Sequence, residues 1–413
     1  QIRKVLERTL GVPLFQEQAM QLAIVAAGFT PGEADQLRRA MGAWRRVGVL
    51  EPFYRKLVHG MLGNGYSKEY AEQVFQHIRG FGEYGFPESH AASFARLAYV
   101  SAWLKFYYPA AFLAALLNSQ PMGFYAPAQL VQDARKHGVE VRPVDVNASD
   151  WCCTLEPVRS SESGATQLRG QSRSAIWALR LGMRLVRGLT YRDAQSLVQA
   201  RVAPYQSMAD LAQRANLGRS ALEKLAYADA FQSLSIDRRN ALWQALGEPV
   251  STSEMPLFGD QMTALTRQSK LPGLTEQEEV FADYHATGLT LRQHPMSFLR
   301  SELSRRGVVS AENLQECEAN DSVKVAGMVL LRQRPSTAKG ITFVTLEDET
   351  GSMNAIVKPA VWKRYERIAT DSQAWIVQGK IERHQEVVHI VVRSLESLVV
   401  DLEHPLQVSR EFH

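Results

Sequence analysis

Residues 323–357 read VKVAGMVLLRQRPSTAKGITFVTLEDETGSMNAIV, and this stretch decides the fold of the final part of the chain. Apolar and β-branched residues alternate or run together in Val323–Leu331, Thr342–Leu346 and Asn354–Val357, with turn-forming residues between them. A period of two is typical of strands that have one buried face. The stretch therefore predicts three consecutive strands joined by short loops.

Two further strands are expected at Ala374–Gly379 and Val387–Val392, and a helix at Pro359–Ile368 falls between the third and fourth strands. Five strands with a helix at this place have the order of an OB-fold, which is a small closed barrel. We assign residues 301–400 to this barrel and residues 401–413 to a C-terminal tail.

The period changes to that of a helix upstream of the barrel. Residues 1–147 are predicted to be mostly helical, and residues 148–247 to form shorter helices between glycines and prolines. At Thr30, with Pro31 next and Glu33 three residues on, the sequence has the pattern of a capped helix start. The expected helices in the first region are Phe15–Val25, Ala34–Met41, Ser67–Ile78, Ala91–Tyr107 and Ala110–Leu117.

Residues 248–300 have the composition of a linker, rich in Gly, Pro, Ser, Thr and charge. The fold class predicted for the whole chain is thus multidomain α+β, mostly helical at first and ending in an OB-fold β-barrel. A length of 413 residues fits two to four domains. The opening Gln in place of Met indicates an excised fragment or a processed product.

Composition excludes several classes of protein. No run of about 18 apolar residues is present, so the sequence predicts no membrane span. The three cysteines, Cys152, Cys153 and Cys317, have neither a disulfide pattern nor metal-ligand spacing, which favours a reducing cytoplasm. The net charge is only +4, but basic clusters recur along the chain, as expected for a protein that binds a polyanion along a path. Solvated helix faces are the alternative for each cluster alone.

Two places in the helical region are candidates for phosphate binding. Arg38 and Arg39 are adjacent in one expected helix, and guanidinium groups bind phosphate oxygens in forked pairs. The turn from Phe81 through Tyr84 delivers Ser89 and His90 to the start of a long helix, where free N–H groups attract phosphate. The alternatives are an ordinary basic helix face, a simple N-cap at Ser89 and a structural histidine.

These residues carry a resemblance to a known family. The ordered blocks Phe15–Gln18, Ala34–Gly42 and Gly85–Ala95 resemble the fingers domain of C-family bacterial DNA polymerases, the polymerase III alpha type. The form Phe-Pro-Glu-Ser-His, which ends at His90, resembles the error-prone, damage-inducible branch. The resemblance implies the C-terminal half of a DNA-directed DNA polymerase used in damage-induced mutagenesis and translesion synthesis. By the same resemblance, Arg38 and Arg39 contact the incoming dNTP, with Tyr84, Ser89 and His90 bordering the site.

The family also implies two DNA-binding modules. Leu179–Ala194 resembles its helix-hairpin-helix region, predicted here as two helices joined by a glycine turn, or else a packed αα-hairpin. The DNA-binding candidates in this module are Arg184, Arg187, Gly188 and Arg192. In the barrel, a basic first loop and an aromatic residue suit single-stranded DNA, because charge binds the backbone and a ring stacks on bases. The candidates there are Arg332, Arg334, Lys339 and Phe343, with Phe343 as a core residue the alternative.

The linker contains one apolar island, Met255–Phe258, where replicative relatives carry a sliding-clamp peptide. Met255, Leu257 and Phe258 are therefore candidates for clamp binding, and a packing anchor is the alternative. The family further implies accessory proteins of a mutagenesis complex as partners.

Catalytic carboxylates are not expected in this sequence. Polymerases hold two metal ions with palm carboxylates, and the family places these before the fingers. We therefore assign residues 1–147 to the C-terminal part of the fingers, residues 148–247 to the helix-hairpin-helix domain and no catalytic or metal-binding residue to the chain. Mg²⁺ is expected only for the full-length polymerase, and the fragment alone is predicted to be inactive. A non-catalytic adaptor that binds single-stranded DNA and recruits partner proteins is the alternative.

Overall fold

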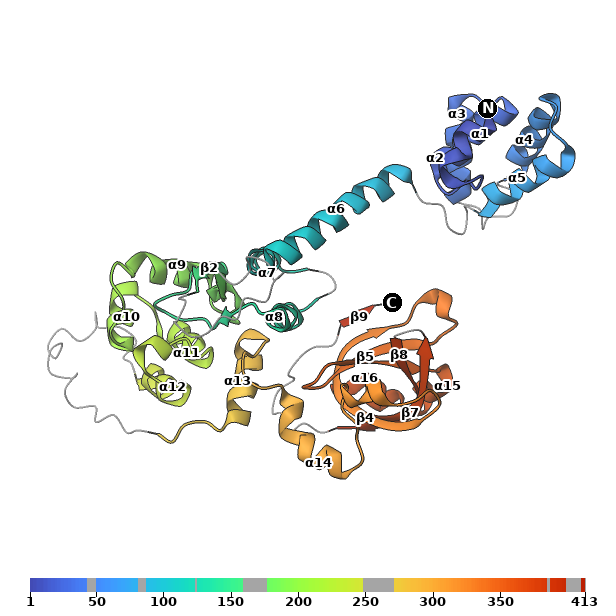
Figure 1. The fold of residues 1–413 in the computed structure, drawn as a ribbon. Helices are drawn as coiled ribbons and strands as arrows, with labels where there is room; N and C mark the ends of the chain where they lie inside the picture. Colours follow the sequence, from blue (N-terminus) through green and yellow to red (C-terminus); the bar gives the residue numbers. More distant parts are fainter. Residues whose placement is uncertain are drawn as a thin grey trace, which may run out of the picture. The chain divides into compact units, whose positions relative to one another are not determined.

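The computed structural model describes residues 1–42, 50–80, 87–122, 125–158, 177–247, 271–384, 387–398 and 410–412. The chain divides into two compact units, residues 1–104 and residues 105–413, which are drawn in Figure 1 and described separately below. Within the described part of the chain, no helix combines the length and the apolar character needed to cross a bilayer.

The first unit is helical, as predicted. Its elements are α1 (Ile2–Leu6), the 3-10 turn η1 (Glu7–Thr9), α2 (Gln16–Ala27), α3 (Pro31–Gly42), α4 (Glu51–Gly63), α5 (Lys68–Gly80) and the larger part of α6 (Glu88–Tyr107). The start predicted at Thr30 is confirmed: the Glu33 carboxylate accepts from the Thr30 N–H at 2.9 Å, and the Glu33 N–H donates to the Thr30 hydroxyl at 3.3 Å. Alanines of α2 and Leu22 pack against α3 and α4, and α5 packs on α4 to complete the core.

Gln18, in the block Phe15–Gln18 at the start of α2, has a structural role. Its side chain is only 2% exposed. The amide oxygen accepts from the N–H groups of Leu14 and Phe15 at 2.9 and 3.1 Å, and the amide nitrogen donates to the Val5 carbonyl at 3.1 Å. The glutamine therefore fixes the turn before α2 to α1 and has no atom left for a ligand.

The second unit begins with a helical domain built around a small sheet. Its elements are α7 (Pro109–Asn118), α8 (Pro127–Lys136), β1 (Val141–Arg142), β2 (Thr154–Pro157), β3 (Trp177–Arg180), η3 (Met183–Leu185), α9 (Tyr191–Ala200), α10 (Met208–Ala215), α11 (Arg219–Tyr227), η4 (Gln232–Leu234) and α12 (Arg238–Gly247). The strands lie in the order β1-β3-β2. One core joins α7 and α8 to the later helices, from Ala110 to Ala245. The structure therefore places α7 and α8 with the second module, whereas the sequence predicts the boundary at residue 147.

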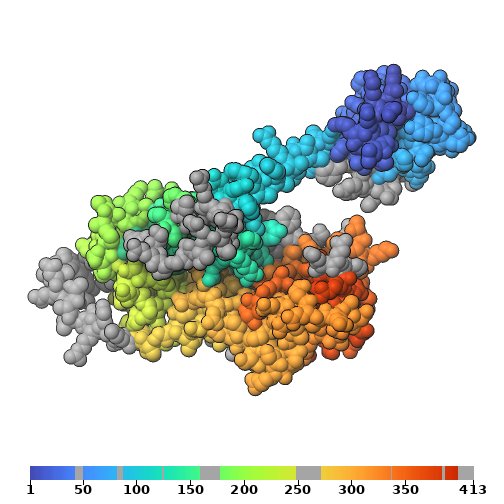
Figure 2. Space-filling view, in the orientation of Figure 1, coloured from blue at the N-terminus to red at the C-terminus, as the bar shows by residue number. Residues whose placement is uncertain are grey.

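Part of the segment assigned as a linker is folded. Residues 248–270 lie outside the described residues, but α13 (Glu276–Thr287), η7 (Pro295–Leu299), α14 (Arg300–Arg305) and η8 (Asn313–Glu316) follow. Ala286 of α13 belongs to the core of the helical domain. Val280 and Tyr284 of the same helix pack with Met328 and Ile376 of the barrel, and side chains fill the space between α13 (yellow) and the barrel (orange) in Figure 2. The composition of residues 271–300 was misleading because α13 has three glutamates in its first turn, although its Val280, Tyr284 and Ala286 are buried.

The last module is a closed barrel. Its elements are β4 (Ser322–Gln333), η9 (Ser336–Ala338), β5 (Thr342–Glu347), β6 (Ser352–Val357), α15 (Pro359–Arg364), α16 (Glu366–Asp371), β7 (Ala374–His384) and β8 (Val387–Ser397). The sheet order β5-β6-β8-β7-β4 closes through the pairing of β4 with β5. A short strand β9 (Arg410–Phe412), from the predicted tail, pairs in parallel with Leu331–Gln333 of β4. The predicted five-stranded OB-fold, with its helical segment between the third and fourth strands, is confirmed.

Candidate nucleic-acid interface

Arg38 and Arg39 lie on the surface of α3. Their side chains are 42% and 74% exposed, and both form ion pairs with Asp35, at 2.9 and 2.8 Å. Hydrogen bonding from Arg38 and the two positive charges lower the pKa of the Asp35 carboxyl. Two guanidinium groups that share one carboxylate leave a net positive charge on the surface. The pair is thus accessible, and a phosphate would have to compete with Asp35 for it.

The start of α6 differs from the expectation. The helix begins at Glu88, so Ser89 lies in its first turn and is not the N-cap. The Glu88 N–H donates to the Glu17 carboxylate at 2.7 Å, and Arg8 pairs with Glu88 at 2.7 Å. Since a carboxylate already occupies this helix N-terminus, phosphate binding through the free N–H groups there is not favoured. Ser89 and His90 are exposed, and the His90 ring lies 4.4 Å from that of Phe94. Tyr84 lies outside the described residues.

The hairpin of the helical domain also differs in detail. The segment before it is the strand β3 and the single 3-10 turn η3 rather than a helix, and only α9 after it is helical. Gly188 has a φ of +74°, which explains why glycine occupies this turn. Thr190 caps α9 by accepting from the Asp193 N–H at 3.1 Å.

Two of the four hairpin candidates have charged groups that are accessible to a ligand. Arg187 and Arg192 are exposed, and neither side chain forms a hydrogen bond or ion pair with another described residue. Arg184 is used differently: its guanidinium donates to the carbonyl of Gln120 at 3.0 Å and to that of Asn118. Arg184 therefore ties the turn to the end of α7, and this takes it out of the set available to DNA.

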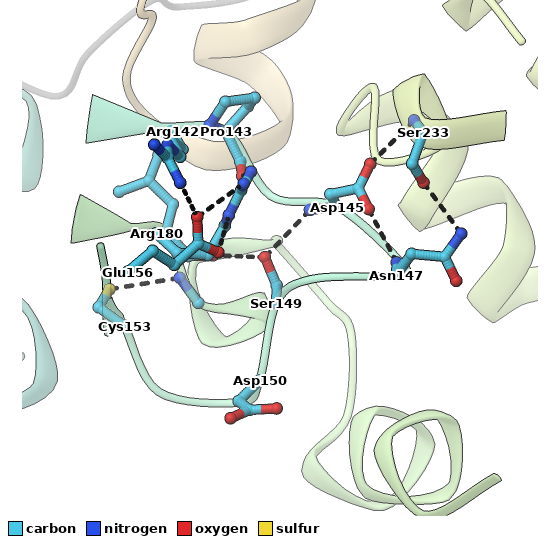
Figure 3. Close-up of polar contacts among 12 residues, drawn as sticks. Arg142, Pro143, Asp145, Asn147, Ser149, Asp150, Cys153, Glu156, Arg180 and Ser233 are labelled. Atoms are coloured by element: carbon cyan, nitrogen blue, oxygen red, sulfur yellow. Dashed lines mark hydrogen bonds and ion pairs between the residues drawn. The ribbon is translucent and has the colours of Figure 1, made fainter. Parts of the chain in front are cut away.

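A buried polar network holds this part of the domain in place, as Figure 3 shows. Ser149 donates to the Leu181 carbonyl at 2.7 Å and accepts from the Asp145 N–H at 3.0 Å. The Asp145 carboxylate accepts from the Ser233 N–H at 3.0 Å. Glu156 lies between two arginines, Arg142 at 2.5 Å and Arg180 at 2.7 Å. These contacts are structural, and they fix the backbone at Leu181, a few residues before the hairpin.

The outer face of the barrel carries a row of apolar side chains. Phe343 on β5 pairs with Ile356 on β6, which in turn pairs with Val391 on β8. Phe343 is 37% exposed, and the other two are partly exposed, while Val344 on the next position is buried. Phe343 therefore points away from the core, which decides against the alternative of a core residue.

A basic loop adjoins this row. Arg334 and Lys339 lie between β4 and β5, are exposed and form no hydrogen bond or ion pair with another described residue. Lys339 and Gly340 have φ angles of 50° and 83°. The Arg334 guanidinium passes 3.5 Å from where a Cβ of Gly340 would lie, so the glycine leaves room for it. Strands two and three of the barrel with this loop are the part by which OB-folds bind oligonucleotides.

Arg332 does not belong to this surface. It is 5% exposed, donates to the Ser372 carbonyl at 2.8 Å and lies 5.4 Å from the centre of the Trp375 ring. The prediction placed it in the loop, but β4 runs on to Gln333, and the pairing of β4 carries the arginine into the barrel wall. Ile356 and Val391 were missed, because strand alternation indicates their face only once the register is known.

The acidic pair of the barrel is structural. Asp348 is fully buried and accepts hydrogen bonds from Arg300 and from the Ala311 N–H, each at 2.9 Å. Glu349 accepts from the same arginine at 3.0 Å. No group of three or more His, Cys, Asp or Glu side chains that could hold a metal ion is found in the residues that the structure covers. The candidate clamp residues, Met255, Leu257 and Phe258, lie outside the described residues.

Three parts of the chain match models of known protein families. Residues 1–65 match the bacterial DNA polymerase III alpha subunit finger domain, residues 138–241 the helix-hairpin-helix motif, and residues 323–398 the OB-fold nucleic acid binding domain. An error-prone DNA polymerase of Rhodopirellula baltica is 53% identical over 96% of this chain, and one of Methylococcus capsulatus is 52% identical over 100% of it. The chain belongs to the error-prone DNA polymerase family.

The error-prone polymerase relatives are longer than this chain, which spans 34% of the first and 39% of the second. Among solved structures, asparaginyl-tRNA synthetase from Pyrococcus horikoshii is 22% identical over 24% of this chain and 24% of its own, with a TM-score of 0.20. A likeness of that size says nothing about function. Family membership rests on the polymerases alone.

Proposed function

We propose that this chain is the nucleic-acid-holding part of an error-prone DNA-directed DNA polymerase that acts in the cytoplasm during damage-induced mutagenesis and translesion synthesis. Identity of about half over nearly the whole chain to polymerases of that name supports the proposal. The observation that carries it is the outer face of the barrel, where an exposed aromatic ring adjoins a loop with two basic residues that have no partner among the described residues.

Single-stranded template would bind to this face of the barrel. Stacking of a base on an exposed ring such as Phe343 contributes about 1–3 kcal/mol, whatever the base is. Arg334 and Lys339 would bind the phosphates on the same side. A polymerase that copies damaged template benefits from contacts that do not depend on sequence, because the altered base need not be read.

Duplex primer–template would bind at the hairpin of the helical domain. Arg187 and Arg192 flank the exposed turn at Gly188, and their guanidinium groups are open to solvent. Contacts with phosphates position the protein on DNA and carry no sequence information. This suits a module that must follow the duplex as it lengthens.

The incoming dNTP would be bound in part by Arg38 and Arg39 of the first unit. Their exposure supports this role, and release of Asp35 would accompany binding. The Mg²⁺ ions and their carboxylates would come from the part of the polymerase that this chain does not span, and the chain alone would not incorporate nucleotides. In the full-length enzyme, Arg38→Ala plus Arg39→Ala should raise the nucleotide KM or lower kcat and leave DNA affinity nearly intact. An equal loss of DNA binding would argue against this role.

Accessory proteins of a mutagenesis complex, and the sliding clamp, are proposed partners. Leu257 and Phe258 supply the apolar pair that a clamp peptide inserts in a pocket, with Met255 before them. A pull-down with these proteins should lose the clamp when Leu257→Ala and Phe258→Ala are combined. Unchanged recovery of the clamp would exclude this peptide as its ligand.

The barrel assignment is tested by binding of labelled single-stranded DNA across a range of salt concentrations. Arg334→Glu plus Lys339→Glu should flatten the slope of log K against log salt by at least about 1.4, since each phosphate contact on a single strand contributes about 0.7. Lys363→Glu plus Arg364→Glu, an equal charge change on α15, is the matched control. If both pairs flatten the slope equally, the loop has no special role.

A further inference from the structure

The hairpin is surrounded by residues from two other helices. The Arg187 N–H donates to the Ala286 carbonyl of α13 at 2.8 Å. On its other side, the Lys224 side chain of α11 passes Gly188 so closely that a Cβ there would lie 3.3 Å from the Lys224 Cε and 3.8 Å from its Nζ. The surface next to the turn is therefore built from three segments that are far apart in sequence.

The Lys224 ammonium is held over the turn without a protein partner. Its side chain is partly buried against the glycine, and it forms no hydrogen bond or ion pair with any residue in the described part of the chain. Neighbouring basic residues are different: Arg219 on the same helix pairs with Glu223 at 2.9 Å, and Arg184 is bound to carbonyls. A lysine that is positioned but unpaired is open to an anion from outside.

The surface continues one turn along α11. Tyr227 is 45% exposed, and its ring centre lies 5.9 Å from that of His285, an exposed residue of α13. Arg187 reaches the C-terminal end of α13, where its Nη2 lies 3.6 Å from the place that a Cβ of Gly288 would occupy. Arg187, Lys224, Tyr227 and His285 thus surround the turn, and all four can donate a hydrogen bond.

We propose that Lys224, Tyr227 and His285 form, together with the hairpin, one strip that binds the phosphates of duplex DNA. This inference rests on the proposed function of the chain and assigns three further residues to the same site. The four residues around the turn, Arg187, Lys224, Tyr227 and His285, comprise two cationic side chains, a phenol and a histidine, and none of the four is acidic. Duplex DNA presents regularly spaced phosphates, which this arrangement suits better than a single small anion.

The test measures binding of the 413-residue chain to a fluorescent primer–template duplex between 50 and 200 mM salt. Lys224→Ala should lower the slope of log K against log salt by about 0.9. Between the two salt limits, the affinity of this variant should then fall by a factor about three-fold smaller than that of the unaltered chain. Lys224→Arg should restore the slope because it keeps the charge. His285→Ala and Tyr227→Phe should each raise the Kd. Lys136→Ala, which removes a charge from exposed α8, is the matched control and should leave both quantities unchanged.

Arg187→Ala distinguishes failure of this inference from failure of the proposed function. If Arg187→Ala weakens binding while Lys224→Ala and His285→Ala bind as the unaltered chain does, the extended strip is refuted and the hairpin role stands. If Arg187→Ala also has no effect, both are refuted. Arg187, Tyr227 and His285 are exposed, and Lys224 is only partly buried, so an unchanged melting temperature is expected and would show that a loss of affinity is not a loss of folding.

Discussion

Arg238 offers the sharpest test of how the helical domain holds α13. Its side chain is fully buried and contacts three carboxylates: Asp283, Glu279 at 3.3 Å and Asp229 at 3.9 Å. It also donates to the Glu279 backbone carbonyl at 2.9 Å. Burial raises the pKa of Glu279, as expected where three acids share two arginines. Arg238→Ala would leave this acidic group with Arg292 alone.

The cost follows from this geometry. Removing one partner of a buried ion pair destabilises a protein by about 3–5 kcal/mol. Arg292 lowers that figure, since it is 40% exposed and stays in contact with Asp229 at 2.8 Å and with Glu279 at 3.1 Å. We therefore expect a loss at the lower end, about 3 kcal/mol. For a unit of this size, that corresponds to a fall in Tm of about 6–12 °C.

Scanning calorimetry of the whole chain is the appropriate assay, because the two units need not unfold together. One transition should move, and the other should stay. Arg239→Ala is the matched control: the side chain is next in sequence, 34% exposed and 3.7 Å from Glu278. An exposed pair of this kind contributes less than about 1 kcal/mol. Equal shifts for the two variants would refute the view that the buried arginine holds α13.

Four other perturbations have definite expected outcomes. Asp348→Ala removes a buried acceptor of several hydrogen bonds and should lower the free energy of unfolding of the barrel by about 3 kcal/mol in urea. An unchanged barrel transition would contradict this expectation. Gln18→Ala should cost about 2 kcal/mol in the first unit, and a Tm equal to that of the unaltered chain would contradict its role. Gly60→Ala would press a methyl group of α4 into the backbone of α2 and should lower the free energy of unfolding by about 1–3 kcal/mol. An unchanged stability would mean that α4 can move away from α2 without loss. The hydrogen bond from Lys56 lowers the pKa of Glu33 to about 2. The small contribution of Glu33 to stability is therefore present above the pKa of the unfolded state and is lost as the pH falls from about 4 toward 2. Glu33→Gln should remove this pH dependence from the Tm measured in acid.

The regular elements could be predicted because their signals are local. The capping box at Thr30 and the alternation in β5 each depend on neighbouring residues, and both are as expected. The segment before Gly188 was predicted as a helix by its resemblance to a helix-hairpin-helix region, but its first part is the strand β3, which pairs with β1 and β2. Strand pairing depends here on residues 20 to 38 positions away, which a local pattern does not contain. The helix α13 was missed for a different reason: its capping box at Thr275 and Glu278 is a local signal, but the segment around it has the composition of a linker.

The sequence indicated that the candidate site contains basic residues, but not which of them are exposed to a ligand. Arg187, Arg334 and Lys339 are exposed without a described partner, whereas Arg184 and Arg332 have theirs within the fold. The sequence does not distinguish these four arginines and one lysine, because all are basic residues near a turn. Whether such a side chain meets a carbonyl depends on the tertiary path of another segment. Lys224 could not have been chosen, because its importance comes from its place over a glycine 36 positions earlier.

The way in which α13 is held has a practical meaning for anyone who builds chimeric polymerases. A barrel excised at residue 301 would leave behind the helix whose Val280 and Tyr284 complete its packing. A donor segment that starts near residue 271 would bring that helix, but it would also need acids that suit the recipient's Arg238. The natural cassette for exchange is therefore the barrel together with its preceding helix, and compatibility at one buried arginine sets which donors can be accepted.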